Sequence, residues 1–163
     1  MTLRLVRVDD RLIHGQITTF WTRNIQADMI LVADDKAAND PLQKNLMKIA
    51  VPSGVDVEVL AVEQAGQRLM SSEWGDRQVF LILRSPVSLL ELVQMGVPIE
   101  AANVGNVGGG EGKERLTKQV AATPEEMEAW HALDEAGVQL EVQWLPGDSK
   151  TDLNRILRER RGR

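Results

Sequence analysis

Apolar residues fall into short runs that alternate with stretches of helical spacing along the whole chain. Residues 29–33 and 79–83 are apolar throughout, as strands are when both faces of their sheet are covered. Residues 55–60 alternate valines with other side chains, the period-2 pattern of a strand. This alternation of strand and helix patterns predicts βα units around a mainly parallel sheet.

About seven strands and six helices are predicted in this way. The strands cover residues 3–8, 29–33, 55–60, 79–83, 101–104, 116–121 and 138–144. The helices cover residues 15–24, 62–70 and 151–161, a segment that starts at Pro41, one from Pro86 to Gly96, and one from a capping box at Thr123 to Gly137. No repeat or linker divides the chain. We therefore expect one doubly wound α/β domain over residues 1–163, with helices on both faces of the sheet.

Composition agrees with a globular domain and excludes several classes of protein. Of the 163 residues, 43% are hydrophobic and 26% are charged. No apolar run reaches the roughly 18–20 residues of a membrane span, and no secretory signal is visible, so we expect a cytoplasmic protein. The absence of cysteine excludes disulfides and thiol chemistry. A net charge of −5 argues against nucleic-acid binding, and the basic residues 158–163 are interpreted as a solvated or frayed tail and not as a binding element.

The densest group of chemically active side chains lies in residues 7–17, between the first predicted strand and the first predicted helix. In a doubly wound sheet this loop opens at the carboxyl edge, where ligands bind. His14 stands directly before the helix, and a neutral imidazole is a nucleophile that accepts and releases a phosphoryl group near neutral pH. The free N–H groups at the start of the helix face an anion held there; they belong to Gly15, Gln16 and Ile17.

Charged neighbours of His14 complete this candidate site. Arg11 supplies a guanidinium group that neutralises phosphate charge, and Asp9 or Asp10 fixes either the tautomer of the ring or the position of the arginine. These residues alone leave a second interpretation open, in which His14 is an ordinary loop histidine among surface charges.

Residues 8–17, Val-Asp-Asp-Arg-Leu-Ile-His-Gly-Gln-Ile, carry a specific motif, with Trp21 just downstream. They resemble the active-site signature of the IIB subunits in the mannose/fructose/sorbose family of sugar phosphotransferase systems. Further matches follow in order at residues 84–86 (Arg-Ser-Pro), 103–105 (Asn-Val-Gly) and 137–146. The resemblance therefore spans nearly the whole chain.

This resemblance implies a phosphotransferase that works through a phosphohistidine, without metal or cofactor. Members of the family accept a phosphoryl group on Nδ1 of the signature histidine, here His14, from a histidine of a IIA protein. They hand it to a sugar during transport through the membrane subunits IIC and IID. The resemblance also implies a cytoplasmic domain at the permease and phosphate contacts from Arg84 and Ser85. Ser85 is equally well placed to cap the helix that follows it.

Other polar features are interpreted without a catalytic role. Residues 105–113 are rich in glycine, but Val107 and Glu114 break the P-loop pattern, so we predict a mobile loop near the site. His131 is predicted to be a surface or boundary residue, because its sequence neighbourhood lacks the spacing of metal ligands. Asp34 and Asp35 follow a strand, and nothing in the sequence supports a metal there.

Two alternative functions stay open at this point. One is a regulatory member of the same family that is phosphorylated on His14 but moves no sugar. The other is a ligand-binding α/β domain in which His14 forms no covalent bond. The sequence is also compatible with a homo-oligomer.

Overall fold

The chain folds around one large sheet whose strands follow the order β3-β2-β4-β1-β5-β8-β9. The computed structural model describes residues 1–162. All neighbouring strands in this sheet are parallel except β8 and β9. The strands are β1 (Thr2–Val8), β2 (Met29–Ala33), β3 (Asp56–Leu60), β4 (Gln78–Leu83), β5 (Ala101–Val104), β8 (Gln139–Val142) and β9 (Thr151–Asp152). β6 (Glu114–Arg115) and β7 (Ala121–Ala122) pair separately.

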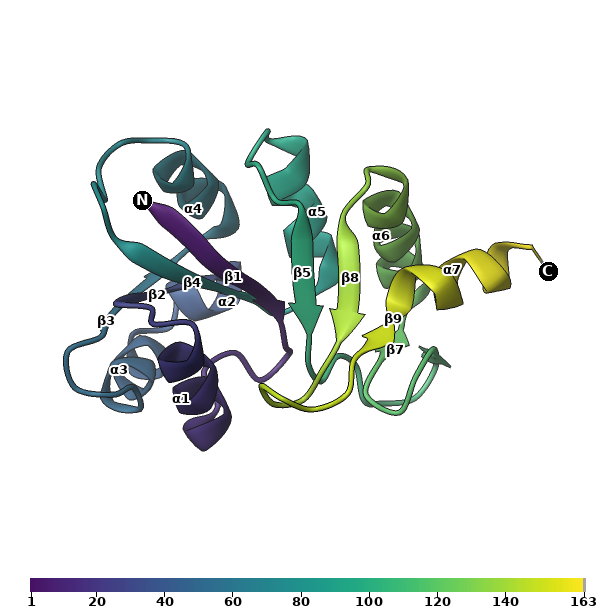
Figure 1. Cartoon of the computed structure of the whole chain (residues 1–163), viewed down its shortest axis with the longest axis horizontal. Helices are drawn as coiled ribbons and strands as arrows, with labels where there is room; N and C mark the ends of the chain where they lie inside the picture. The colour runs from purple at the N-terminus through teal and green to yellow at the C-terminus, as the bar shows by residue number, and fades with distance from the viewer. Residues whose placement is uncertain (163) are drawn as a thin grey trace.

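Helices cover both faces of the sheet, as predicted for a doubly wound domain (Figure 1). They are α1 (Gly15–Asn24), α2 (Asp35–Ala38), α3 (Pro41–Ile49), α4 (Val62–Leu69), α5 (Pro86–Gln94), α6 (Pro124–Glu135) and α7 (Leu153–Arg161). One core joins the sheet to α4, α5, α6 and α7, and the other joins it to α1, α2 and α3. Apolar β2 and β4 serve both cores, since neighbours such as Leu31 and Ile30 point to opposite faces.

Helix starts follow the cap residues of the sequence. Asp40 accepts hydrogen bonds from the N–H groups of Leu42 and Gln43, and proline opens the first turn of α3. Thr123 and Glu126 form the predicted capping box of α6. Each cap stabilises its helix by about 0.5–2 kcal/mol, because it satisfies N–H groups that have no partner inside the helix.

Four elements differ from the prediction. Of the predicted strand over residues 116–121, only Ala121 belongs to a strand, β7, because the N–H groups of Leu116 and Thr117 both donate to the Val120 carbonyl and close a turn between β6 and β7. The predicted strand over residues 138–144 is shorter, ending at Val142. α2 and β9 were not predicted, because elements of four and two residues are too short to leave a periodic pattern.

Residues 158–161 are mostly exposed, as expected for a solvated segment, but they are helical and not frayed. Residues up to Arg161 belong to α7, and Arg158 and Arg160 are ion-paired with Asp134 and Glu114. Arg163 lies outside the described residues. No helix within residues 1–162 is long and apolar enough to cross a bilayer.

The parallel strands bring the polar loops of the chain to one edge of the sheet. This carboxyl edge lies at the bottom of Figure 1, where the arrowheads of β5 and β8 point. Backbone hydrogen bonds join its loops: the Asp9 N–H donates to the Leu83 carbonyl, and the Gly105 N–H donates to the Val8 carbonyl. Residues far apart in the sequence thus meet beside the loop that contains His14.

Candidate active site

His14 lies at the junction of the β1–α1 loop and α1. Its backbone N–H donates to Oγ1 of Thr18 at 2.7 Å, and its carbonyl accepts the Thr18 N–H at 3.4 Å. These bonds fix the backbone of His14 as the N-cap of α1, whereas its side chain makes no capping bond. The residue is exposed, so a second protein can reach the imidazole.

The backbone on both sides of His14 adopts the left-handed conformation. Leu12 has a φ of 57° and Gly15 a φ of 48°. For an aliphatic residue such as Leu12 this conformation costs about 1–2 kcal/mol, and burial of its side chain in the core holds it there. A Cβ on Gly15 would meet no atom within 4 Å, so this position favours glycine through its backbone angle and not through crowding.

The amino terminus of α1 provides donors for an anion. The first bond of the helix joins Thr18 to the His14 carbonyl, so the N–H groups of Gly15, Gln16 and Ile17 have no acceptor inside the helix. The helix dipole adds partial positive charge at this end. The first turn of α1 contains no acidic residue that would oppose an anion.

Asp9 is the buried centre of the charged loop. Its side chain, 3% exposed, accepts bonds from Nη2, Nε and the backbone N–H of Arg11 at 2.8, 2.9 and 3.1 Å. Burial alone would raise the pKa of Asp9, but the Arg11 bonds and the charge of Arg7 outweigh it and lower the pKa. The hydrogen bond to Asp9 raises the pKa of Arg11. Asp9 therefore fixes the position of the arginine, one of the two roles that the sequence left open.

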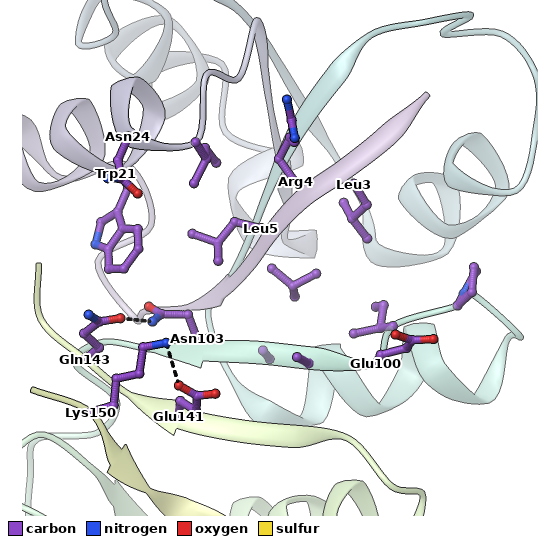
Figure 2. Close-up of a pocket in the computed structure, with 16 residues that line it drawn as sticks. Leu3, Arg4, Leu5, Trp21, Asn24, Glu100, Asn103, Glu141, Gln143 and Lys150 are labelled. Atoms are coloured by element: carbon purple, nitrogen blue, oxygen red, sulfur yellow. Dashed lines mark hydrogen bonds and ion pairs between the residues drawn. The ribbon is translucent and has the colours of Figure 1, made fainter. Parts of the chain in front are cut away.

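Arg7 supports the same carboxylate from inside the sheet. It donates to Asp9 at 3.4 Å and to the carbonyls of Gln143 and Trp144 at 2.9 and 3.2 Å. It also donates to the side-chain oxygen of Asn103, whose amide donates to Gln143 (Figure 2). Burial lowers the pKa of Arg7 to about 10, which still leaves the guanidinium charged at neutral pH.

Two tryptophans flank these guanidinium groups. Arg7 lies over the ring of Trp21, 5.2 Å from its centroid, and Arg11 lies over the ring of Trp144 at 4.5 Å. Both distances fall within the roughly 6 Å range of cation–π attraction. The indole N–H of Trp21 donates to the Trp144 carbonyl at 3.1 Å and ties α1 to the segment after β8. Arg7, Asp9 and Arg11, which we call the arginine–aspartate cluster, are thus held by several elements.

Asp10 binds the glycine-rich loop. Its Oδ2 accepts the N–H of Gly108 at 2.8 Å, and its Oδ1 accepts the side-chain amide of Asn106 at 3.3 Å. Within residues 1–162, neither Asp9 nor Asp10 is hydrogen-bonded to the His14 imidazole. The prediction that residues 105–113 lie near the site is confirmed. Asp10 was suggested to fix either the His14 ring or the arginine, but its side chain is hydrogen-bonded to neither. Its two carboxylate oxygens accept hydrogen bonds from the glycine-rich loop instead.

Arg84 and Ser85 lie at the end of β4 on the carboxyl edge. Two nitrogens of Arg84 form a bidentate pair with Asp34 at 3.1 Å each, and a third donates to the Asp10 carbonyl at 3.3 Å. Asp34 also caps α2. Ser85 accepts the N–H of Ser88 and so caps α5, the second of the roles weighed for it. Arg84 is therefore anchored against the β1–α1 loop.

A trough of about 480 Å³ lies behind this cluster, between α1 and the face of β1, β5 and β8 (Figure 2). Trp21 and Asn103 form part of its lining. Its charged residues Glu141 and Lys150 are paired with each other at 3.1 Å. In the described part of the chain, no three His, Cys, Asp or Glu side chains form a group that would hold a metal ion.

Sequence reasoning assigned no part in the site to Thr18, Gln143 or Trp144, and it gave Arg7 and Asn103 no specific contact. These residues come from separate segments, so no local spacing connects them. One signal was nevertheless present. A charged residue within an apolar strand, as Arg7 is in β1, is buried only when a carboxylate and other acceptors surround it.

Comparison with known proteins finds relatives over nearly the whole chain. The family model described as "PTS system sorbose subfamily IIB component" matches residues 3–163. The PTS system sorbose-specific EIIB component of Klebsiella pneumoniae is 34% identical over 153 residues, covering 94% of this chain and 93% of that protein. The PTS system fructose-specific EIIB component of Bacillus subtilis (strain 168) is 34% identical over 158 residues and covers 97% of each.

Solved structures give the same result. The crystal structure of the IIBSor domain of the sorbose permease from Klebsiella pneumoniae matches with a TM-score of 0.92 at 33% identity, covering 98% of both chains. That of the N-acetylgalactosamine-specific IIB component 1 from Escherichia coli matches with a TM-score of 0.85 at 30% identity, covering 93% of this chain and 99% of that one. Sequence and fold together show that this chain belongs to the sorbose subfamily of IIB components, the phosphocarriers of the mannose-type sugar phosphotransferase systems.

Proposed function

We propose that His14 accepts a phosphoryl group from a phosphohistidine of a IIA protein and passes it to a sugar entering through the membrane subunits IIC and IID. The family gives the class of reaction. The observation that supports the choice of His14 is its exposed position at the amino terminus of α1. The second histidine of the chain, His131, lies in the middle of α6, away from the first turn, so it has no free helix N–H groups beside it.

The proposed transfer consists of two displacements at phosphorus. In the first, Nδ1 of neutral His14 attacks, its bond to phosphorus forms, and the bond from phosphorus to the donor imidazole breaks. The His14 ring releases one proton and the departing ring takes one up. In the second, a sugar hydroxyl oxygen replaces the imidazole on phosphorus, and the hydroxyl proton returns to the imidazole or to water.

The surrounding groups stabilise the charge that the phosphoryl oxygens carry. The N–H groups of Gly15, Gln16 and Ile17 are donors that need no reorganisation during the step. Arg11 adds a positive charge, and its attachment to Asp9 restricts where the guanidinium can move. We assign Arg84 and Ser85 to the same edge as supporting residues, and Asp10 to the positioning of the glycine-rich loop.

The proposed location is the cytoplasm, at the surface of the permease. Relatives named for different sugars are about equally similar to this chain: 34% identity for sorbose, 34% for fructose and 35% for N-acetylgalactosamine. Since these relatives share one IIB fold, we assign the choice of sugar mainly to the membrane subunits.

The test is phosphorylation with the general phosphotransferase components and a matching IIA protein. Intact mass measurement should show one added phosphoryl group, lost in acid and retained in base. His14→Ala should remove this label, whereas the matched variant His131→Ala should retain it. Stoichiometric labelling of His14→Ala would exclude the proposed intermediate. A protein that is labelled but transfers nothing to sugar in the presence of IIC and IID would belong to the regulatory alternative.

A further inference from the structure

Helix α3 exposes an apolar face to solvent. Leu42, Leu46 and Ile49 are 68%, 58% and 80% exposed, whereas Met47 is the side chain that α3 buries. Residues spaced by three and four positions lie on the same side of a helix, so these three form one ridge. We call them the α3 ridge. Exposed aliphatic side chains that gather in this way mark a contact surface.

The α3 ridge lies on the flank of the molecule. α3 packs against α2 and against β3, the outermost strand of the sheet, at the opposite end from α7 (Figure 1). Because α3 connects the end of β2 to the start of β3, it runs from the carboxyl edge back to the amino edge. At the carboxyl edge, β2 and β4 separate β3, against which α3 packs, from β1, which His14 follows, so a partner on the ridge need not cover His14.

The pattern of residues on α3 indicates a protein partner of a definite kind. Leu42, Leu46 and Ile49 occupy positions i, i+4 and i+7, the anchor spacing of a helix that lies in an apolar groove. Lys44 and Lys48 lie to one side and line a shallow hollow between α2 and α3. Residues 41–49 contain no acidic side chain. A groove complementary to this helix would be apolar along its floor and acidic along one wall.

Two other occupants fit α3 less well. A second copy that packed its own α3 against this one would bring Lys44 and Lys48 near the same lysines, with no acidic side chain on α3 to pair with them. A bilayer surface suits longer helices with aromatic residues at their apolar border, whereas α3 has nine residues, opens with proline and contains no aromatic side chain. The net charge of −5 also opposes approach to anionic lipid.

We propose that the α3 ridge docks into a groove of this kind on the cytoplasmic side of the membrane permease. This inference rests on the proposed function, which makes the permease the place where His14 meets the sugar. The IIA donor has to reach the His14 edge and leave after each transfer. A tether on the flank holds the chain at the permease throughout, and so raises the effective concentration of phosphorylated His14 near the sugar.

The test is binding of the purified chain to phosphatidylethanolamine–phosphatidylglycerol vesicles that contain the IIC and IID subunits, with protein-free vesicles as the reference. Wild type should bind only the loaded vesicles. The double variant Leu42→Asp/Leu46→Asp should bind about tenfold more weakly or worse, as expected for anchor residues. Both leucines are exposed, so the variant should fold, as circular dichroism will check. Met70→Asp changes an exposed apolar residue outside α3 and should bind like wild type.

The charge of the groove is tested separately. Lys48→Glu should weaken binding to the loaded vesicles, and the remaining binding should depend less on salt. The matched variant Lys118→Glu alters an exposed lysine elsewhere and should change neither property. Equal effects of the two variants would overturn the assignment of an acidic wall beside Lys48.

The remaining outcomes show whether a negative result overturns the docking proposal or the proposed function. Phosphorylation of the leucine double variant by IIA should proceed at the wild-type rate; a slower rate would make the donor the occupant of the ridge. If wild type bound protein-free vesicles as well as loaded ones, the ridge would contact lipid. If wild type formed a concentration-dependent dimer that the leucine double variant did not form, the ridge would contact a second copy of the chain. Each of these results overturns the proposal. Failure of wild-type labelling, with ridge-dependent binding intact, would remove the proposed function alone.

Discussion

Arg7 and Arg11 at the carboxyl edge and two arginines of α7, Arg155 and Arg161, show two ways in which a protein holds the same side chain. In α7, Arg155 and Arg161 pair with Glu159 and Glu135, and both members of each pair are exposed. At the carboxyl edge, two arginines converge on Asp9, a carboxylate that is only 3% exposed. Exposed pairs change partners at little cost, whereas a buried carboxylate requires its cations in one geometry. Burial of the acid, rather than the number of arginines, therefore determines where a guanidinium is fixed.

The largest effect should come from Asp9→Asn. Asparagine keeps the shape of the side chain but removes the charge opposite buried Arg7 and Arg11. Loss of one partner from a buried ion pair costs about 3–5 kcal/mol, and we expect the free energy of unfolding in urea to fall by this amount. Glu159→Gln, the matched change in α7, should cost less than about 1 kcal/mol. Similar small losses in both variants would remove the distinction between the two regions.

The second-largest effect tests how much the backbone N–H groups, rather than the arginines, contribute to phosphoryl transfer. Gly15→Val places a β-branched residue at a φ of 48°, so the start of α1 must shift and its N–H groups lose their direction. The loss of one well-placed donor costs about 2.7–4 kcal/mol in related oxyanion sites, which corresponds to a transfer rate lower by roughly 10²–10³-fold. The rate is measured from phosphorylated IIA. Gly15→Asn, which tolerates this φ, should retain much more activity. Equal rates for wild type and the valine variant would show that side chains alone hold the phosphate.

Arg11→Ala should act on both transfer and stability. A hydrogen bond to a charged group contributes about 1.5–3 kcal/mol, so the rate of transfer to His14 should fall by roughly 10–100-fold. The sequence alone suggests an exposed loop charge whose removal costs little stability. The structure predicts a measurable decrease in the free energy of unfolding, because Asp9 loses two side-chain donors. Arg155→Ala in α7 provides the control. An unchanged stability of Arg11→Ala would mean that Arg7 alone is sufficient for Asp9.

The smallest effect is the pH dependence of the same contrast. The pKa of Asp9 is lowered in the folded protein from an unfolded value of about 3.9, so its stabilising contribution is fully present above that value. It is lost as the pH falls through the folded pKa. The difference in unfolding free energy between wild type and Asp9→Asn should stay constant from about pH 8 to pH 5 and shrink only below about pH 4. A decline that begins between pH 6 and pH 5 would contradict a lowered pKa.

The fold could be predicted because each of its main elements is indicated by a local sequence pattern that extends over several residues. β2 and β4 are apolar throughout, and the caps at Asp40 and Thr123 mark helix starts in the sequence itself. The predictions of secondary structure failed where one or two hydrogen bonds determine the local conformation. Residues 116–121 have the composition of a strand, but the Val120 carbonyl accepts two local N–H groups, and strand pairing is limited to Ala121 with Arg115 and to a single bridge of Val120 with Val107.

The candidate site could be predicted only in part, because its contacts depend on register between distant strands. The motif around His14 was readable, and so was the position of the motif at the carboxyl edge. The partners of its charged residues were not. Asp10 lies beside Gly108 only because β1 and β5 are neighbours, and Asn103 reaches Arg7 for the same reason. Tertiary pairing of this kind leaves no spacing in the sequence.

The most direct test of the proposed phosphoryl transfer is to identify the nitrogen atom that is bonded to phosphorus. The protein is labelled with ¹⁵N in its histidine rings, phosphorylated through IIA, and examined by ¹H–¹⁵N and ³¹P NMR at basic pH. We predict coupling of phosphorus to Nδ1 of His14, with the signals of His131 unchanged and the coupling absent in His14→Ala. Coupling at His131, at Nε2 of His14, or at no histidine would contradict the proposed transfer.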